Sequence, residues 1–278
     1  MVCNALEADG HIIKTVDPPS PYNGLVIASQ LLTSDGCQTI ASFLRSGEQQ
    51  DAGAAQLCFY MRLPRLFKYF QYLWVKYVRR DSLWAGLLRH FHQKSSTDLW
   101  RLVAQREAYK ASWHEWWESF GRGEVAEQGR KPDVILTVPN AMPALPHGAM
   151  RDAVSSCGYT FLFNMVCCYN LCQVSPPHVH QYFLCLTFLQ LDYPSGVLPV
   201  THVDQDLDKL PQKFDFKNLN GIEMGAYMHY DASKMSGLPI GIQVIGQRFQ
   251  EEKVLATMEK IEDCLHKRKQ GFTPLDIK

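Results

Sequence analysis

Serine side chains are the first candidates for chemistry, because the chain contains two adjacent serine pairs, Ser95–Ser96 and Ser155–Ser156. A serine hydroxyl becomes a good nucleophile only beside a base, and backbone N–H groups must face the oxyanion that forms. Neither pair has a cluster of glycines around it, and no two glycines are adjacent anywhere in the chain. Ser95–Ser96 is typical of a helix cap, and Ser155–Ser156 stands at the start of a helical segment. We therefore predict no catalytic residue in this chain.

A second candidate group lies in the segment Met165–Gln190. Its potential zinc ligands are Cys167, Cys168, Cys172, His178, His180 and Cys185. Structural zinc sites usually leave about two to four residues between paired cysteines and about three to five between paired histidines. Here a single residue separates the histidines, and the cysteines do not repeat that spacing. A small zinc-binding protein stays open as an alternative, but we expect no metal site and no cofactor.

Two apolar stretches near the end of the chain are the elements that must position the side chains of a functional site. They are GLPIGIQVIG at Gly237–Gly246 and PSGVLPVTHVD at Pro194–Asp204. Proline at position 239 fixes the entry into the first stretch, and its β-branched residues suit a strand buried on both faces. Gly241 and Gly246 have no Cβ, so other atoms can pack closely against them. Both stretches predict strands inside an α/β core.

These stretches also resemble the amidase-signature hydrolases. GLPIGIQVIG and the following QRFQEEKVL (247–255) are similar to the closing strand and last helix of that family. LDYPSGVLPVTHVD (191–204) and KPDVILTVPNAMPA (131–144) resemble the family in the same order and at approximately the same spacing. Within the family, the chain is most similar to the fatty acid amide hydrolases and the fungal general amidases. The resemblance implies a partial amidase-signature α/β fold, a mixed β-sheet covered by helices with a helical hydrophobic cap.

The same resemblance implies that residues 1–278 form the C-terminal portion of a single amidase domain. Catalysis in the family depends on two serines and a lysine, with the nucleophile in a Gly-Ser-rich loop that this chain does not contain. We therefore expect a C-terminal fragment of a hydrolase that cleaves amide C–N bonds, on fatty-acid-amide or general amide substrates. Without the Ser-Ser-Lys half, it should be inactive alone. A non-catalytic membrane-associating module is the alternative.

The segment Leu57–Phe91 is crowded with Phe, Tyr, Trp and Leu. Its cations exclude a membrane-spanning helix, which needs about 20 consecutive apolar residues. An aromatic face flanked by Lys and Arg suits a helix at a membrane surface, where the cations meet anionic lipid. Amphipathic helices folded onto the core, with the cations at their rim, are the alternative. The cations are Arg62, Arg65, Lys68, Lys76, Arg79 and Arg80. Fatty acid amide hydrolases carry a similar Leu-Pro-Arg-x-Phe-Lys cap that rests on the membrane, so the resemblance favours a helical membrane cap at 57–91.

The resemblance also implies positions along a substrate channel, because apolar residues line an acyl tunnel in fatty acid amide hydrolases. The matching positions are Leu57, Tyr60, Leu87 and Phe91 in the cap, Val154, Cys157 and Phe161 on the next helix, and Met224 before the last strand. An amide or N-acyl lipid would be the substrate there. Ordinary core packing is the alternative for each position. Met224 stands where the family more often has an aromatic ring, which makes long-chain specificity less secure.

Residues 165–190 break the family pattern. A family member would continue almost directly from YTFLFN (159–164) to the Leu-Asp-Tyr-Pro of residues 191–194. The intervening residues show no consistent periodicity of apolar side chains, and they contain the double proline Pro176–Pro177. We interpret this segment as an insertion or a retained intron.

Amino-acid composition limits the other classes of function that the protein could have. Basic and acidic residues number 28 each, giving a formal net charge of +0, whereas a nucleic-acid partner would call for a surplus of cations. Nine cysteines at irregular spacing do not match a secreted disulfide framework, and the start MVCNALEADGH lacks the apolar run of a signal peptide. We expect an intracellular protein, cytoplasmic or peripheral on a cytoplasmic membrane face. A homodimer stays open.

Overall fold

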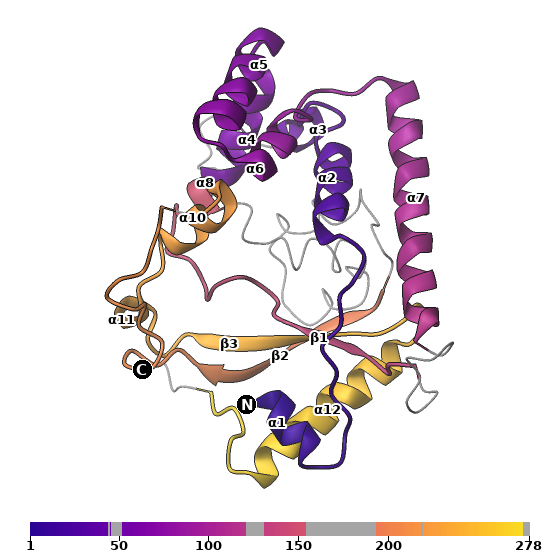
Figure 1. Cartoon of the computed structure of the whole chain (residues 1–278), viewed down its shortest axis with the longest axis vertical. Helices are drawn as coiled ribbons and strands as arrows, with labels where there is room; N and C mark the ends of the chain where they lie inside the picture. The colour runs from indigo at the N-terminus through magenta and orange to yellow at the C-terminus, as the bar shows by residue number, and fades with distance from the viewer. Residues whose placement is uncertain (44, 46–51, 121–130, 154–192, 218, 275–278) are drawn as a thin grey trace.

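The computed structural model describes residues 1–43, 45, 52–120, 131–153, 193–217 and 219–274. A small β-sheet lies across the middle, with helices on both sides (Figure 1). Its strands are β1 (Ile135–Thr137), β2 (Ser195–His202) and β3 (Pro239–Ile245). The α/β class expected from the sequence is therefore confirmed.

The two apolar stretches pair directly with each other. β3 is the central strand, and it runs antiparallel to β1 on one side and to β2 on the other. Ser195 lies opposite Ile245, and His202 lies opposite Pro239, with an irregularity in the register between Pro199 and Thr201. Both pairings are antiparallel, so the described strands include no parallel pair of the expected mixed sheet.

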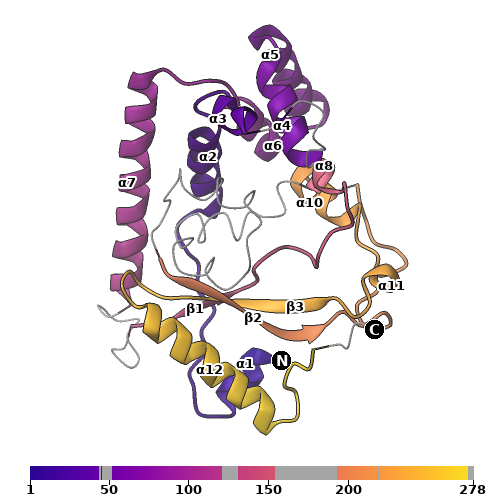
Figure 2. The same ribbon diagram turned by 180° about the vertical axis from the view of Figure 1, so that it is seen from behind.

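The carboxyl end of β3, residues 243–245, is buried on both faces, whereas Pro239 at its start is exposed and residues 240–242 are half-buried. Val244 packs with Val200 and with residues of α1 (Val2–Glu7) and α12 (Glu251–Lys267), including Leu6 and Ile261. Ile245 points to the opposite face, where it packs with Trp113 and other aromatic side chains of α7 (Ser96–Ser119). Figures 1 and 2 show α1 and α12 on one side of the sheet and α7 on the other. Because successive side chains of a strand point to opposite faces of the sheet, Val244 and Ile245 belong to different clusters.

Two glycines permit close packing against β3. A Cβ atom on Gly241 would lie 2.9 Å from Val197 Cγ1, and one on Gly246 would lie 2.6 Å from Val254 Cγ2. Neither distance leaves room for a methyl group. Gly241 therefore allows β2 and β3 to approach, and Gly246 allows the start of α12 to fold back against the end of the strand.

Most of the remaining helices lie above the sheet in Figure 1, whereas α11 (Ala232–Met235) lies at about the level of the sheet. The others are α2 (Pro21–Leu32), α3 (Gln38–Ser42), α4 (Ala52–Arg62), α5 (Arg65–Leu73), the π-helix η1 (Trp74–Val78), α6 (Ser82–Leu88), α8 (Met150–Ala153) and α10 (Gly221–Tyr227). Ser95 caps α7 through a hydrogen bond from the Asp98 N–H to its hydroxyl, as the sequence predicts. The expected cap segment 57–91 corresponds to most of α4 and to α5, η1 and α6.

Residue type alone does not decide strand pairing or burial near the two ends of the chain. The segment His11–Val16 contains β-branched residues but is extended without strand pairing. The apolar Leu255 on α12 is 59% exposed. It follows Val254 by one residue, and adjacent residues on a helix point in different directions. The expected insertion at 165–190, with its potential zinc ligands, lies outside the described residues.

Candidate functional site

The interior of the cap brings together three of the predicted channel residues. Leu57 packs against a buried cluster that contains Cys37, Cys58 and Met61, and Phe91 packs against the same cluster. Phe91 also meets Tyr60 edge to face, with ring centroids 6.1 Å apart. Tyr60 and Phe91 contact a second cluster, formed by Val75, Ala85 and Leu88. Phe91 thus joins the two apolar clusters of the cap.

Asp81 joins the helix that carries Met224, another predicted channel residue, to the cap. Its carboxylate accepts hydrogen bonds from the Trp84 N–H at the start of α6 and from the Gly221 N–H at the start of α10. Leu87 on α6 is buried, and Met224 on α10 is half-buried. One carboxylate therefore caps α6 and joins α10 to it, although the two helices are far apart in the sequence.

The other three predicted positions, Val154, Cys157 and Phe161, lie outside the described residues. Five of the eight can be placed: Leu57, Tyr60 and Phe91 share one apolar region, and Leu87 and Met224 belong to two helices joined through Asp81. Leu57, Tyr60 and Phe91 pack among apolar and aromatic side chains. Such a lining can hold an acyl chain.

The sequence does not reveal that Lys68 is buried. Both interpretations of the cap place its cations on the outside, either along the flanks of an aromatic face or at the rim of the helices, yet Lys68 is only 8% exposed. Its Nζ donates to the main-chain oxygens of Met61 at 2.8 Å and Phe91 at 3.3 Å, and it lies 5.3 Å from the ring centroid of Tyr60. Burial lowers the pKa of Lys68. Its partners are carbonyls, so this lysine is not the base of a serine nucleophile.

The outer face of the cap is rich in exposed aromatic and aliphatic side chains. They are Phe59, Leu66, Phe67, Tyr69, Phe70, Trp74, Tyr77, Val78 and Leu83, here called the aromatic face. The Arg79 guanidinium lies 5.8 Å from the ring centroid of Trp74, and Lys76 Nζ lies 5.1 Å from that of Tyr77. Of the helices in the described part of the chain, none is both long enough and apolar enough to cross a bilayer.

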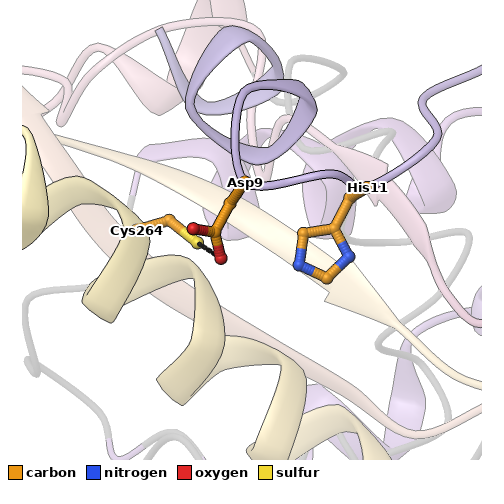
Figure 3. A group of neighbouring side chains, drawn as sticks. All are labelled: Asp9, His11 and Cys264. Atoms are coloured by element: carbon orange, nitrogen blue, oxygen red, sulfur yellow. Dashed lines mark hydrogen bonds between the residues drawn. The ribbon is translucent and has the colours of Figure 1, made fainter.

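A separate polar cluster joins the start of the chain to its last helix (Figure 3). Asp9, His11 and Cys264 place potential metal-ligating atoms within 4.8 Å of one another. The Cys264 thiol donates to Asp9 Oδ2 at 3.4 Å. Lys260 and Lys267 also approach the Asp9 carboxylate, at 3.4 Å and 3.3 Å, and this set lowers the pKa of Asp9 to about 2. Because two lysines already compensate its charge, we interpret the cluster as a polar link and not as a metal centre.

A broad cleft has a lining separate from the five described channel residues. Its volume is about 1840 Å³, and it is lined by residues 10–16, by Trp113, Trp116 and Phe120, by β1, and by Tyr227 and Tyr230. Small-molecule pockets usually measure roughly 300–1,000 Å³. The cleft is therefore larger than one ligand requires, and Leu57, Tyr60, Leu87, Phe91 and Met224 do not line it.

The family model described as "Amidase" matches residues 1–255, and the chain belongs to this family. The resemblance noted in the sequence is thereby confirmed.

Curated relatives are similar along most of the chain. An "Acetamidase" of Aspergillus oryzae is 25% identical over 269 residues, covering 95% of this chain and 37% of the relative. "Fatty-acid amide hydrolase 1" of Sus scrofa is 26% identical over 261 residues, covering 93% of this chain and 38% of the relative. A solved structure of "Fatty acid amide hydrolase" is similar in fold, with a TM-score of 0.61 at 18% identity, covering 95% of this chain and 35% of that one. The chain thus spans less than two-fifths of the length of these relatives.

Proposed function

We propose that this chain forms the substrate-binding and cap portion of an amidase-family enzyme that hydrolyses amide C–N bonds. The observation that carries the proposal is the apolar interior of the cap, where Leu57, Tyr60 and Phe91 meet in a chain that belongs to the family. An acyl chain would lie along these residues, with Leu87 and Met224 nearby. Fatty-acid amides and general amides are the two candidate substrate classes, since relatives of both names are similar to the chain.

The catalytic serines and lysine would come from residues that these 278 do not include. The chain has no glycine-rich serine loop, and it spans only 37% and 38% of the two relatives described above. We propose that the rest of the amidase domain packs along the broad cleft beside β1. Two features support this placement: the cleft is too large for one ligand, and it borders a strand at the edge of the described sheet.

Turnover measurements test this proposal. The purified 278-residue protein should not hydrolyse acetamide or a fatty-acid amide, whereas a protein extended upstream with a Gly-Ser-rich loop should. In the extended enzyme, Phe91→Ala should raise KM for the fatty-acid amide more than for acetamide, because a short acyl group does not reach the cap interior. Turnover by the 278 residues alone would contradict the proposal.

Peripheral membrane contact through the cap is the second part of the proposal, and it would also serve the alternative of a non-catalytic membrane-associating module. Its support is the aromatic face, whose exposed rings lie beside Lys76 and Arg79. Apolar side chains and cations arranged in this way suit the interface of an anionic bilayer.

Vesicle co-sedimentation tests the membrane contact. The double variant Phe67→Ser with Phe70→Ser should bind vesicles more weakly, because it removes two exposed rings of the aromatic face. Phe249→Ser is the matched control, since Phe249 is also exposed but lies between β3 and α12. Arg79→Glu with Arg80→Glu should weaken binding to anionic vesicles. Absence of vesicle binding, or an equal loss of binding in the control variant, would exclude the proposed membrane contact.

A further inference from the structure

Several cationic side chains gather where the amino end of α5 meets the segment after α6. Lys68 Nζ donates to the Phe91 carbonyl at 3.3 Å, and Lys94 Nζ donates to the His90 carbonyl at 2.8 Å. Lys94 Nζ also lies 3.2 Å from His92 Nε2. The short segment His90–His92 therefore has a lysine bound on either side. Together with Arg65, the first residue of α5, these side chains are here called the basic cluster: Arg65, Lys68, His92 and Lys94.

The basic cluster has no matching negative charge among the described residues. No ion pair involves Arg65, Lys68 or Lys94 in that part of the chain. Asp98 is the carboxylate that acts on Lys94, but it accepts a hydrogen bond from Ser95 Oγ at 2.7 Å and pairs with Arg101 at 3.4 Å. The residue before α5 is Pro64, which offers no side-chain cap, and no acidic residue stands in the first turn. The helix dipole therefore adds positive potential at this point.

The positive charges of the basic cluster lower one another's pKa. The pKa of His92 is lowered by burial first, and then by Lys94, Arg65, His90 and Lys68. The pKa of Lys94 is lowered to about 8, mainly by burial and also by Arg65, whereas Asp98 raises it. The hydrogen-bond partners of Lys68 and Lys94 are neutral, and a buried cation without a negatively charged partner is costly for the folded state. A bound oxyanion would remove that cost by supplying the missing charge.

We propose that the basic cluster binds the anionic phosphate-monoester headgroup of a phospholipid such as phosphatidic acid. Phosphate is favoured because a cluster of cations at an uncapped helix start is a general anion-binding arrangement. A lipid is favoured over free phosphate because Leu66 and Phe67, the two residues after Arg65, are 63% and 65% exposed on the aromatic face. A phosphate at Arg65 would thus lie at headgroup level when these side chains enter the acyl region. The inference rests on the membrane contact proposed above.

Vesicle binding by the full chain tests this site. Phosphatidylcholine vesicles are compared with vesicles that also contain phosphatidic acid, which carries a phosphate monoester. Arg65→Gln with Lys94→Gln should reduce binding to the phosphatidic-acid vesicles by about tenfold or more and leave phosphatidylcholine binding unchanged. The control pair is Lys213→Gln with Lys217→Gln, which removes two exposed cations outside both the cap and the basic cluster. An equal loss in both pairs would indicate diffuse surface charge and would overturn the proposal.

Lys68→Met separates a binding role from a structural one. If Lys68 serves the ligand, the variant should keep or raise the melting temperature, because it removes a buried cation, and should lose the preference for phosphatidic acid. A lower melting temperature with unchanged preference would show that the lysine holds the cap together, and would overturn its place in the site.

Two further outcomes separate this inference from the proposed function. Binding to phosphatidylcholine with no preference for phosphatidic acid would overturn the phosphate site while the membrane contact stands. The protein could instead bind neither vesicle, and inorganic phosphate could stabilise it in a way that disappears in Arg65→Gln with Lys94→Gln. This result would assign the site to free phosphate and would contradict lipid binding.

Discussion

Asp9 contacts the last helix through three side chains. It accepts a hydrogen bond from the Cys264 thiol and pairs with Lys260 and Lys267, which stand on the same helix. All three contacts depend on the ionised carboxylate. The contact joins residues that are 255 positions apart in the sequence.

The pH dependence of stability should reveal this contact. The pKa of Asp9 falls from 3.8 to about 2 in the folded protein, through the Cys264 hydrogen bond first and then through Lys267. Because the folded-state pKa is the lower one, the unfolded chain binds the proton more readily. The stabilisation is therefore complete above about pH 4 and is lost as the pH falls toward 2. Melting temperatures measured across this range should fall more steeply for the natural protein than for Asp9→Asn, and parallel curves would contradict the assignment.

At the scale of elements, α12 shows how a helix divides between core and solvent. Val254, Ile261 and Leu265 are buried against the sheet and α1, and Met258 packs beside them. Leu255 belongs to the same apolar set in the sequence but faces outward. The helical period predicts the stripe, whereas its exact edge depends on where the sheet and α1 lie.

Alanine substitutions on α12 should reproduce this division. Ile261 is fully buried, so Ile261→Ala should lower the free energy of unfolding by about 2–5 kcal/mol through lost burial and the cavity left behind. Leu255→Ala is the matched control, and it should change stability by less than about 0.5 kcal/mol because the side chain is 59% exposed. Denaturant titration of both variants is the measurement. Similar losses in the two variants would show that Leu255 is covered in solution.

At the scale of the whole molecule, the described residues contain separate apolar clusters. The clusters that include residues of β3 involve α1, α7, α10, α11 and α12, whereas those of the cap involve α3, α4, α6 and η1. The two regions are joined by polar contacts such as the hydrogen bond from Tyr22 on α2 to the Leu83 carbonyl on α6. We infer that the cap can open without loss of the sheet.

Native-state hydrogen exchange should separate the two regions. The amides of Val244 and Ile245 in the central strand should exchange most slowly, because both residues are fully buried and paired in the sheet. Amides of α5 should exchange earlier, since one side of that helix carries the exposed aromatic face. Equal protection in α5 and β3 would mean that cap and sheet unfold as one unit.

The sequence by itself determined the family, the two paired strands, the capped start of α7 and the apolar content of the cap. Each of these depends on local pattern: β-branched runs bounded by Gly and Pro, a serine before a helix, and the quoted family stretches. Only the tertiary structure decided that Lys68 points inward beside His90–His92, that Asp9 meets Cys264, and that Leu255 faces solvent. These features depend on where elements distant in the sequence come to lie, and local periodicity carries no information about the surface against which a helix packs.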